Sequence, residues 1–146
     1  MADAKSQNYS NHTRWSILHH FIAQPLIVAT FVAATMNAWR EPTVWNLWIV
    51  IFTVALEALA LSARVMALTV QNRVIRLEMR LRLREVLPVP LAARIGELKL
   101  RHLVGLRFAG DAELPKLVER CLAGEFARTS DLKKAITDWQ PDWLRA

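Results

Sequence analysis

Apolar side chains fill two long segments in the first half of the chain, whereas charged side chains recur every few residues in the second half. The first apolar segment covers about residues 15–39 and the second about residues 44–70. As helices, both exceed the roughly 20 residues that cross about 30 Å of hydrocarbon. The linker between them, residues 40–43, contains a proline and permits only an antiparallel turn. The pattern therefore predicts a transmembrane helical hairpin over residues 15–70.

The borders of both apolar segments carry tryptophans. Trp15 opens the first segment, and Trp39, Trp45 and Trp48 cluster around the linker. Because an indole ring combines an apolar body with one N–H donor, it favours the headgroup layer of a membrane. We expect these side chains to act as interfacial anchors.

The first apolar segment is longer than the core of a cleaved signal peptide, which spans about 7–15 residues. We therefore expect it to stay in the protein as a membrane helix. Pro25 lies within this segment and predicts a kink, which a membrane helix tolerates.

Basic side chains are distributed unevenly around the two segments. The linker contains Arg40 as its one basic residue, whereas Lys5 and Arg14 precede the first segment and five arginines lie within residues 71–87, directly after the second. Because short loops rich in Lys and Arg stay in the cytoplasm, both termini are predicted to be cytoplasmic. Residues 1–14 then form an N-terminal cytoplasmic segment.

Polar side chains inside the predicted hairpin are few, and Glu57 is the most costly of them. A charge in the middle of a bilayer must be neutralised, partnered or turned towards protein. The nearest polar groups on the first helix are Gln24 and Thr30, while Arg64 and His20 lie at one level near the inner border. One hypothesis is a proton or ligand site formed by Glu57, Arg64 and His20. The other is that Glu57 bonds a neighbouring helix and Arg64 reaches the headgroups.

The second helix is expected to continue past the membrane as an arginine-rich extension over residues 71–87, because no proline or glycine interrupts it. At about 100° per residue, most of its arginines share one stripe, and Arg82 lies opposite. The arginines of this stripe are Arg73, Arg76, Arg80 and Arg84. A polybasic segment beside a span is attracted to anionic headgroups, so the stripe is a candidate for lipid or partner contact.

The same extension is apolar along two edges. One edge consists of Val74, Leu77 and Leu81, and the other of Ile75, Met79, Leu83 and Val86. A helix that is apolar on two edges needs two neighbours. We therefore expect it to pack against protein as well as to face lipid headgroups.

Residues 88–146 predict a small cytoplasmic domain of short helices. The expected helices cover residues 91–98, 101–109, 112 to about 123, and 131–139. Gly110 and Gly124 are expected to end helices, and Asp111 and Ser130 to cap the next ones. The predicted fold class is therefore all-α: a two-helix transmembrane hairpin, an extended second helix and a small C-terminal helical domain.

Composition adds little chemistry to this picture. The net charge of +6 fits the anionic face of a membrane, and the single cysteine, Cys121, is expected to be a small buried side chain. His19 and His20 have no histidine on the second apolar segment to share a haem with. No P-loop, CxxC pair, HExxH or GxSxG motif is present, and the last predicted helix offers few base-reading side chains. We expect no catalytic residue, metal, cofactor or nucleic-acid partner.

Four stretches of the chain carry a family resemblance. They are residues 7–12 (QNYSNH), 71–78 (QNRVIRLE), 106–115 (LRFAGDAELP) and 133–136 (KKAI) before Trp139. Together they resemble an uncharacterised bacterial family of small two-span membrane proteins with an N-terminal Gln-Asn-x-x-Asn-His motif. The resemblance covers nearly the whole chain and implies a multi-pass protein of the bacterial inner membrane. It brings no activity and no catalytic residue.

The leading functional hypothesis is a non-catalytic accessory or scaffolding subunit of a larger membrane complex. It rests on Glu57 and on the two-edged helix, which offer more adhesive surface than one small chain can bury. The alternative is an independent protein that binds anionic lipid through its arginine stripe. A third hypothesis is a minimal enzyme or carrier that uses Glu57 and His20.

Overall fold

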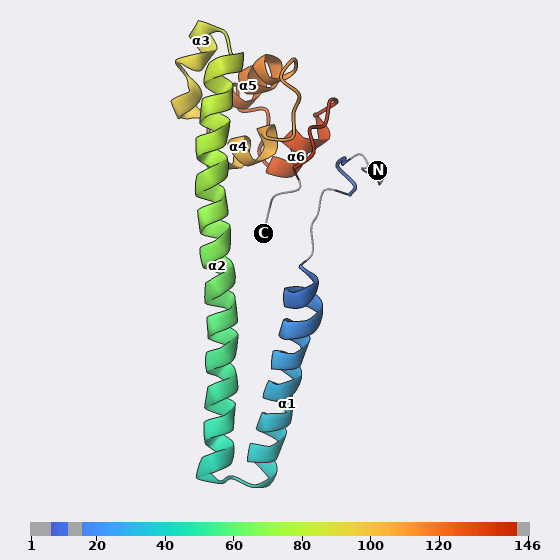
Figure 1. Cartoon of the computed structure of the whole chain (residues 1–146), viewed down its shortest axis with the longest axis vertical. Helices are drawn as coiled ribbons and strands as arrows, with labels where there is room; N and C mark the ends of the chain where they lie inside the picture. Colours follow the sequence, from blue (N-terminus) through green and yellow to red (C-terminus); the bar gives the residue numbers. More distant parts are fainter. Residues whose placement is uncertain (1–6, 12–15, 143–146) are drawn as a thin grey trace, which may run out of the picture. The chain divides into compact units, whose positions relative to one another are not determined.

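The computed structural model describes residues 7–11 and 16–142, and it is helical throughout these residues apart from turns and one isolated bridge (Figure 1). Its elements are η1 (Leu18–Ala23), α1 (Gln24–Arg40), α2 (Val44–Val86), α3 (Val89–Ala92), η2 (Ile95–Glu97), α4 (Leu100–Leu106), α5 (Leu114–Leu122) and α6 (Thr129–Lys134). The chain divides into two compact units. Of the described residues, 16–69 form the hairpin unit, and 7–11 together with 70–142 form the C-terminal unit.

The hairpin unit consists of η1, α1 and the first part of α2, which run antiparallel (Figure 1). Side chains at the tip fix the turn. Thr43 Oγ1 accepts a hydrogen bond from the Asn46 N–H at 3.2 Å, and Asn46 Nδ2 donates to the Glu41 carbonyl at 2.8 Å. Thr43 therefore caps α2, and this local bonding explains why so short a link reverses the chain.

Pro25 stands at the start of α1, directly after the π-helical turn η1. Because proline has no N–H to donate, the carbonyl four residues earlier loses its usual helical hydrogen bond. A wider π turn accommodates that loss and the proline ring. The irregularity expected at Pro25 thus takes the form of a change in helix type.

The hairpin unit buries very little of its apolar surface within itself. The helices Leu18–Arg40 and Val44–Val86 are each long and apolar enough to span a membrane, and 6% of the most apolar window of each is buried. Among the described residues of this unit, only Ala34 and Thr53 are buried. An apolar surface this exposed is unfavourable in water and favourable in lipid or against another protein.

The tryptophans at the hairpin tip are exposed. Trp39 is 89% exposed, Trp45 is 72% exposed and Trp48 is 60% exposed. Trp15 lies outside the described residues. These three indole rings are therefore exposed enough to contact lipid headgroups, as the expected anchoring role requires.

Helix α2 runs without interruption for 43 residues, as the absence of proline and glycine predicts. Its last part belongs to the C-terminal unit, where Ile75, Met79 and Leu83 enter the core. Leu83 is fully buried. One of the two predicted apolar edges therefore finds its neighbour within the chain, in the short helices that follow.

The short helices differ in extent from those predicted. Instead of one helix over 91–98, the chain forms α3 and the single 3₁₀ turn η2, because Pro90 sets a start and residues 93–94 turn. The last helix ends at Lys134 and not at Trp139. Trp139 pairs instead with Ala109 in an isolated antiparallel bridge, and its ring packs on Phe108 with 5.0 Å between centroids. Packing against a buried aromatic ring therefore overrides the local helical pattern.

The glycine and the aspartate predicted to separate two helices have other roles. The Gly110 N–H donates to the Asp138 carbonyl at 2.8 Å, and a Cβ at this position would collide with the Asp138 side chain. The residue that precedes α5 is Glu113, so Asp111 does not cap it. Ser130 likewise lies inside α6, which begins after Arg128. The expectation for Gly124 is confirmed, since its φ of +80° ends α5.

Cys121 lies on α5 in the core of the C-terminal unit and is 3% exposed. Burial, only partly offset by the charge of Arg120, raises the pKa of the Cys121 thiol to about 11. The thiolate is the reactive form, so the folded unit protects this residue. Its expected role as a small buried side chain is confirmed.

Candidate functional site

Glu57 meets Gln24 across the hairpin. Gln24 Nε2 donates a hydrogen bond to Glu57 Oε1 at 2.6 Å. The other oxygen of each side chain, Glu57 Oε2 and Gln24 Oε1, is buried without a hydrogen-bond partner among the described residues. Unpaired buried polar atoms are costly, so this pair is incompletely satisfied by its own chain. Of the polar groups expected near Glu57, Gln24 is the one that bonds it.

A groove of about 380 Å³ opens beside this pair within the hairpin unit. Its apolar walls include Ile27 and Phe31 from α1, together with Ala58 and Leu61 from α2. Glu57 lines the same groove. The groove is therefore apolar and contains one carboxyl group, that of Glu57, which can accept a further hydrogen bond.

The structure does not join Arg64 to Glu57. Among the described residues, Arg64 has no ion pair, and the salt bridges of the chain lie elsewhere. His20 Nδ1 lies 3.1 Å from the Ser16 carbonyl oxygen, in the preceding turn. The three residues that were hypothesised to form one site are thus engaged in different ways.

The four arginines of the predicted stripe share one property. Within the described part of the chain, none of them forms an ion pair or a side-chain hydrogen bond. Arg73, Arg76 and Arg84 are exposed, while Arg80 is half-buried. The Nε of Arg80 is buried and has no hydrogen-bond partner among the residues described. The exposed guanidinium groups of Arg73, Arg76 and Arg84 are therefore available to a ligand or partner.

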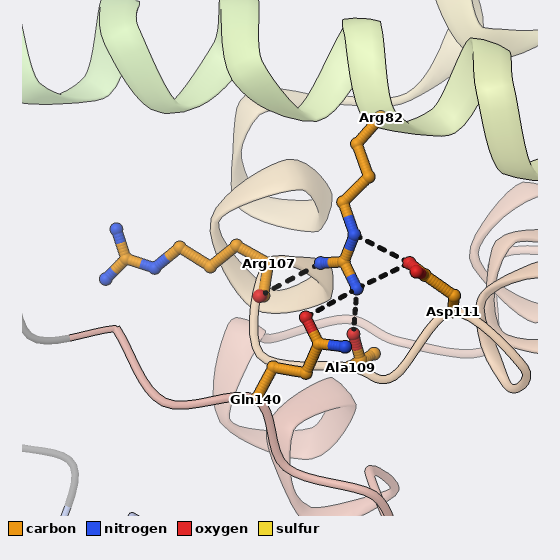
Figure 2. A network of polar contacts seen from close by, with 5 residues as sticks. All are labelled: Arg82, Arg107, Ala109, Asp111 and Gln140. Atoms are coloured by element: carbon orange, nitrogen blue, oxygen red, sulfur yellow. Dashed lines mark hydrogen bonds and ion pairs between the residues drawn. The ribbon is translucent and has the colours of Figure 1, made fainter.

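Arg82 is different, because its guanidinium group is the centre of a polar network (Figure 2). It donates to Asp111 Oδ1 from Nε at 2.8 Å, and its Nη2 forms an ion pair with the same oxygen at 2.7 Å. It also donates to the carbonyls of Arg107, at 3.3 Å, and Ala109, at 2.7 Å, and to Gln140 Oε1 at 2.9 Å. Arg82 thereby fixes two distant segments onto α2.

Sequence reasoning did not find this network, although it placed Arg82 opposite the stripe. That position was the available signal, because an arginine on the core side of a helix needs hydrogen-bond partners in the elements packed there. Asp111 gave no complementary signal, since an aspartate after a glycine has the same appearance as a helix cap.

Residues 7–11 dock onto the end of the C-terminal unit. The side-chain amide of Gln7 pairs with the backbone of Asp142, accepting from its N–H at 2.9 Å and donating to its carbonyl at 3.5 Å. Asn8 Oδ1 accepts from the Ser10 N–H, and Asn11 Oδ1 accepts from the Asn8 N–H, which closes a compact turn. These bonds give the Gln-Asn-x-x-Asn part of the N-terminal motif a structural role. His12 lies outside the described residues.

His102 is buried in the first turn of α4. The Lys99 N–H donates to its Nδ1 at 3.4 Å, so the ring satisfies a backbone donor at the helix start. Burial lowers the pKa of His102 below its usual value, and the charges of Arg101 and Lys99 lower it further. The neutral imidazole therefore serves as a structural acceptor.

Across the residues that the structure describes, no group of three or more His, Cys, Asp or Glu side chains is placed to hold a metal ion. No curated protein and no solved structure matches the chain. A family does match along the whole sequence. The model of the family of unknown function DUF6526 covers residues 1–146, and the chain therefore belongs to that family.

Proposed function

We propose that this protein is a non-catalytic accessory or scaffolding subunit of a larger complex in the bacterial inner membrane. The hairpin spans the membrane, and both termini lie in the cytoplasm. A transmembrane helix of a partner protein occupies the groove between α1 and α2. That helix supplies a hydrogen-bond donor, such as a serine, threonine or asparagine, to Glu57.

The groove is the observation that carries this proposal. Its walls are apolar, so hydrocarbon could fill it, but lipid tails offer no donor to Glu57 Oε2. Interhelical hydrogen bonds from polar side chains satisfy such groups in membranes and contribute roughly 0.6–2 kcal/mol each. A partner helix with a donor therefore fits both the shape and the unpaired oxygen.

Two observations support the orientation. The linker at the hairpin tip contains Arg40 as its one basic residue, whereas five arginines lie within residues 71–87. The contact between Gln7 and Asp142 brings residues near the two ends of the chain together. Such a contact is compatible with a spanning hairpin when both ends lie on one side of the membrane.

Photo-crosslinking from the groove tests the proposal. A photoreactive phenylalanine derivative at Ala58, which lines the groove, should give a discrete heavier product with one membrane protein in native membranes. The matched control is the same substitution at Leu59, which is exposed and does not line the groove. Identical product patterns from both positions would contradict a specific partner in the groove.

A second candidate function is recognition of anionic lipid by Arg76 and Arg84. The observation that favours it is the lack of any ion pair for these exposed side chains within the described residues. Each basic residue near an anionic surface contributes about 1 kcal/mol. Replacing both with glutamine should reduce the binding of added phosphatidylglycerol roughly tenfold or more, measured by native mass spectrometry of the solubilised protein.

The control for lipid binding is Arg94→Gln, which removes one exposed positive charge that is already paired with Glu97 at 2.8 Å. This variant should keep its lipid binding. If Arg94→Gln loses as much lipid binding as the double variant, the loss is due to net charge and the arginine stripe is not a specific lipid site.

A further inference from the structure

The last part of α2 carries an apolar seam that nothing in the described chain covers. The seam consists of Val70, Val74, Leu77 and Leu81, whose side chains are 60%, 47%, 62% and 51% exposed, respectively. It lies about 170° around the helix from the core-facing residues Ile75, Met79 and Leu83. Three of its members, Val74, Leu77 and Leu81, form one of the two apolar edges that the sequence predicts, and this edge has no neighbour among the described residues.

The spacing along the seam is four, three and four residues. This alternation is the heptad pattern of a coiled coil, with Val74 and Leu81 at a positions and Val70 and Leu77 at d positions. The central pair places a β-branched residue at a and a leucine at d, and that combination favours two parallel strands. Arg84 occupies the next d position and ends the apolar seam after two heptads.

Charges of opposite sign flank the seam. Arg73 and Arg80 occupy the g positions on one side, and Glu78 and Glu85 occupy the e positions on the other. In a parallel dimer, a g residue approaches the e residue that lies five positions later in the other chain. Arg73 would therefore face the partner's Glu78, and Arg80 the partner's Glu85, in both symmetry-related halves.

Within the part of the chain that the structure describes, these charges are not paired with one another. Among the described residues, neither Glu78 nor Glu85 has an ion pair. Arg82 is the basic residue that lies within about one helical turn of both glutamates, and it is bonded to Asp111 instead. The buried Nε of Arg80 also lacks a hydrogen-bond partner there. The flanking charges thus match each other across two chains.

We propose that the occupant of this seam is a second copy of the same chain, in a parallel coiled coil over residues 70–81. The parallel direction rests on the proposed membrane insertion, because two copies with one orientation in one membrane present α2 in the same direction. The seam is separate from the groove at Glu57, so the dimer and a partner helix in the groove are compatible. Arg76, off the seam, stays exposed for lipid.

Disulfide trapping tests this arrangement in membranes that contain the full chain. The variant Leu77→Cys, in a Cys121→Ser background, should form a disulfide-linked dimer quickly under mild oxidation. The control Arg76→Cys places a thiol one residue away on the same exposed helix but off the seam, and it should form at least tenfold less dimer. Equal trapping at both positions, or none at position 77, would overturn the proposal.

Charge exchange tests the pairing itself. Arg73→Glu should place like charges opposite each other in both halves and reduce the trapped dimer several-fold. The double variant Arg73→Glu/Glu78→Arg restores opposite charges across the chains and should recover trapping. Failure of the double variant to recover, in protein that still folds, would show that these residues do not face each other.

Flotation of the same membranes with and without alkaline carbonate separates this proposal from the proposed function. If the protein stays with the membrane in carbonate but forms no disulfide-linked dimer through position 77, the dimer is rejected and membrane insertion is supported. If carbonate extracts the protein but the disulfide-linked dimer still forms through position 77, membrane insertion is rejected and the seam is supported as the dimer interface.

Discussion

Leu83→Ala is expected to destabilise the C-terminal unit by about 3 kcal/mol, a typical cost of cutting a fully buried leucine back to alanine. Leu83 is fully buried, and it is one of the residues through which α2 enters the core. Its loss removes transfer energy and leaves a cavity that the surrounding short helices fill only in part. The unit should remain folded but open far more often.

The rate at which Cys121 reacts with a thiol reagent measures this opening. The chain has one cysteine, and in the folded unit it is 3% exposed with a pKa raised by burial to about 11. Labelling therefore reports the fraction of molecules whose C-terminal unit is open. A loss of about 3 kcal/mol predicts labelling roughly a hundredfold faster.

Val89→Ala is the control for Leu83→Ala. It also removes apolar carbon atoms from the C-terminal unit, at a side chain that is 84% exposed and lies outside both the core and the seam. Surface substitutions of this kind change stability by less than about 0.5 kcal/mol. If both variants label at the same rate, Leu83 does not anchor the core in the way described.

Arg82→Gln is expected to be the second most damaging substitution, with a cost of about 2–4 kcal/mol. The guanidinium group bonds two backbone carbonyls, a side-chain amide and a carboxylate. Hydrogen bonds to a charged group contribute roughly 1.5–3 kcal/mol each, and the carbonyls of Arg107 and Ala109 would lose theirs together. The Asp111 side chain is 58% exposed, so solvent screening limits the ion pair itself to about 1 kcal/mol or less.

The labelling of Cys121 reports this substitution too, and Arg84→Gln is its control. Arg84 lies two residues later on the same helix and has no ion pair among the described residues. Arg82→Gln should label at least tenfold faster than the parent protein, and Arg84→Gln should label at the parental rate. Equal rates for the parent and Arg82→Gln would mean that the network in Figure 2 contributes little to the fold.

Local patterns predicted the long elements of this fold well. The uninterrupted helix α2 follows from the lack of proline and glycine between residues 44 and 87, and the cap at Thr43 follows from its place before an apolar run. Antiparallel depth left Gln24 and Thr30 as the polar groups nearest Glu57, and the structure bonds Gln24 to it. Each of these features depends on neighbours in the sequence or on one simple hairpin.

Long-range contacts were out of reach of the same reasoning. The bonds from Arg82 to Asp111 and Gln140 join residues 29 and 58 positions apart, and the bond from Gln7 to Asp142 joins residues 135 positions apart. The sequence offers many equally polar candidates for such contacts. The last helix was overextended for a related reason, since Trp139 follows a helical pattern but is held by Phe108 and Ala109.

The mass of the protein after gentle extraction from its native membranes tests the central proposal most directly. Native gel separation followed by mass spectrometry should place this chain in a complex that contains at least one other membrane protein in fixed proportion. That partner should be lost when Glu57 is replaced with leucine and kept when the exposed Leu59 is replaced with alanine. A chain that migrates alone, or only as a dimer of itself, would contradict the accessory-subunit account.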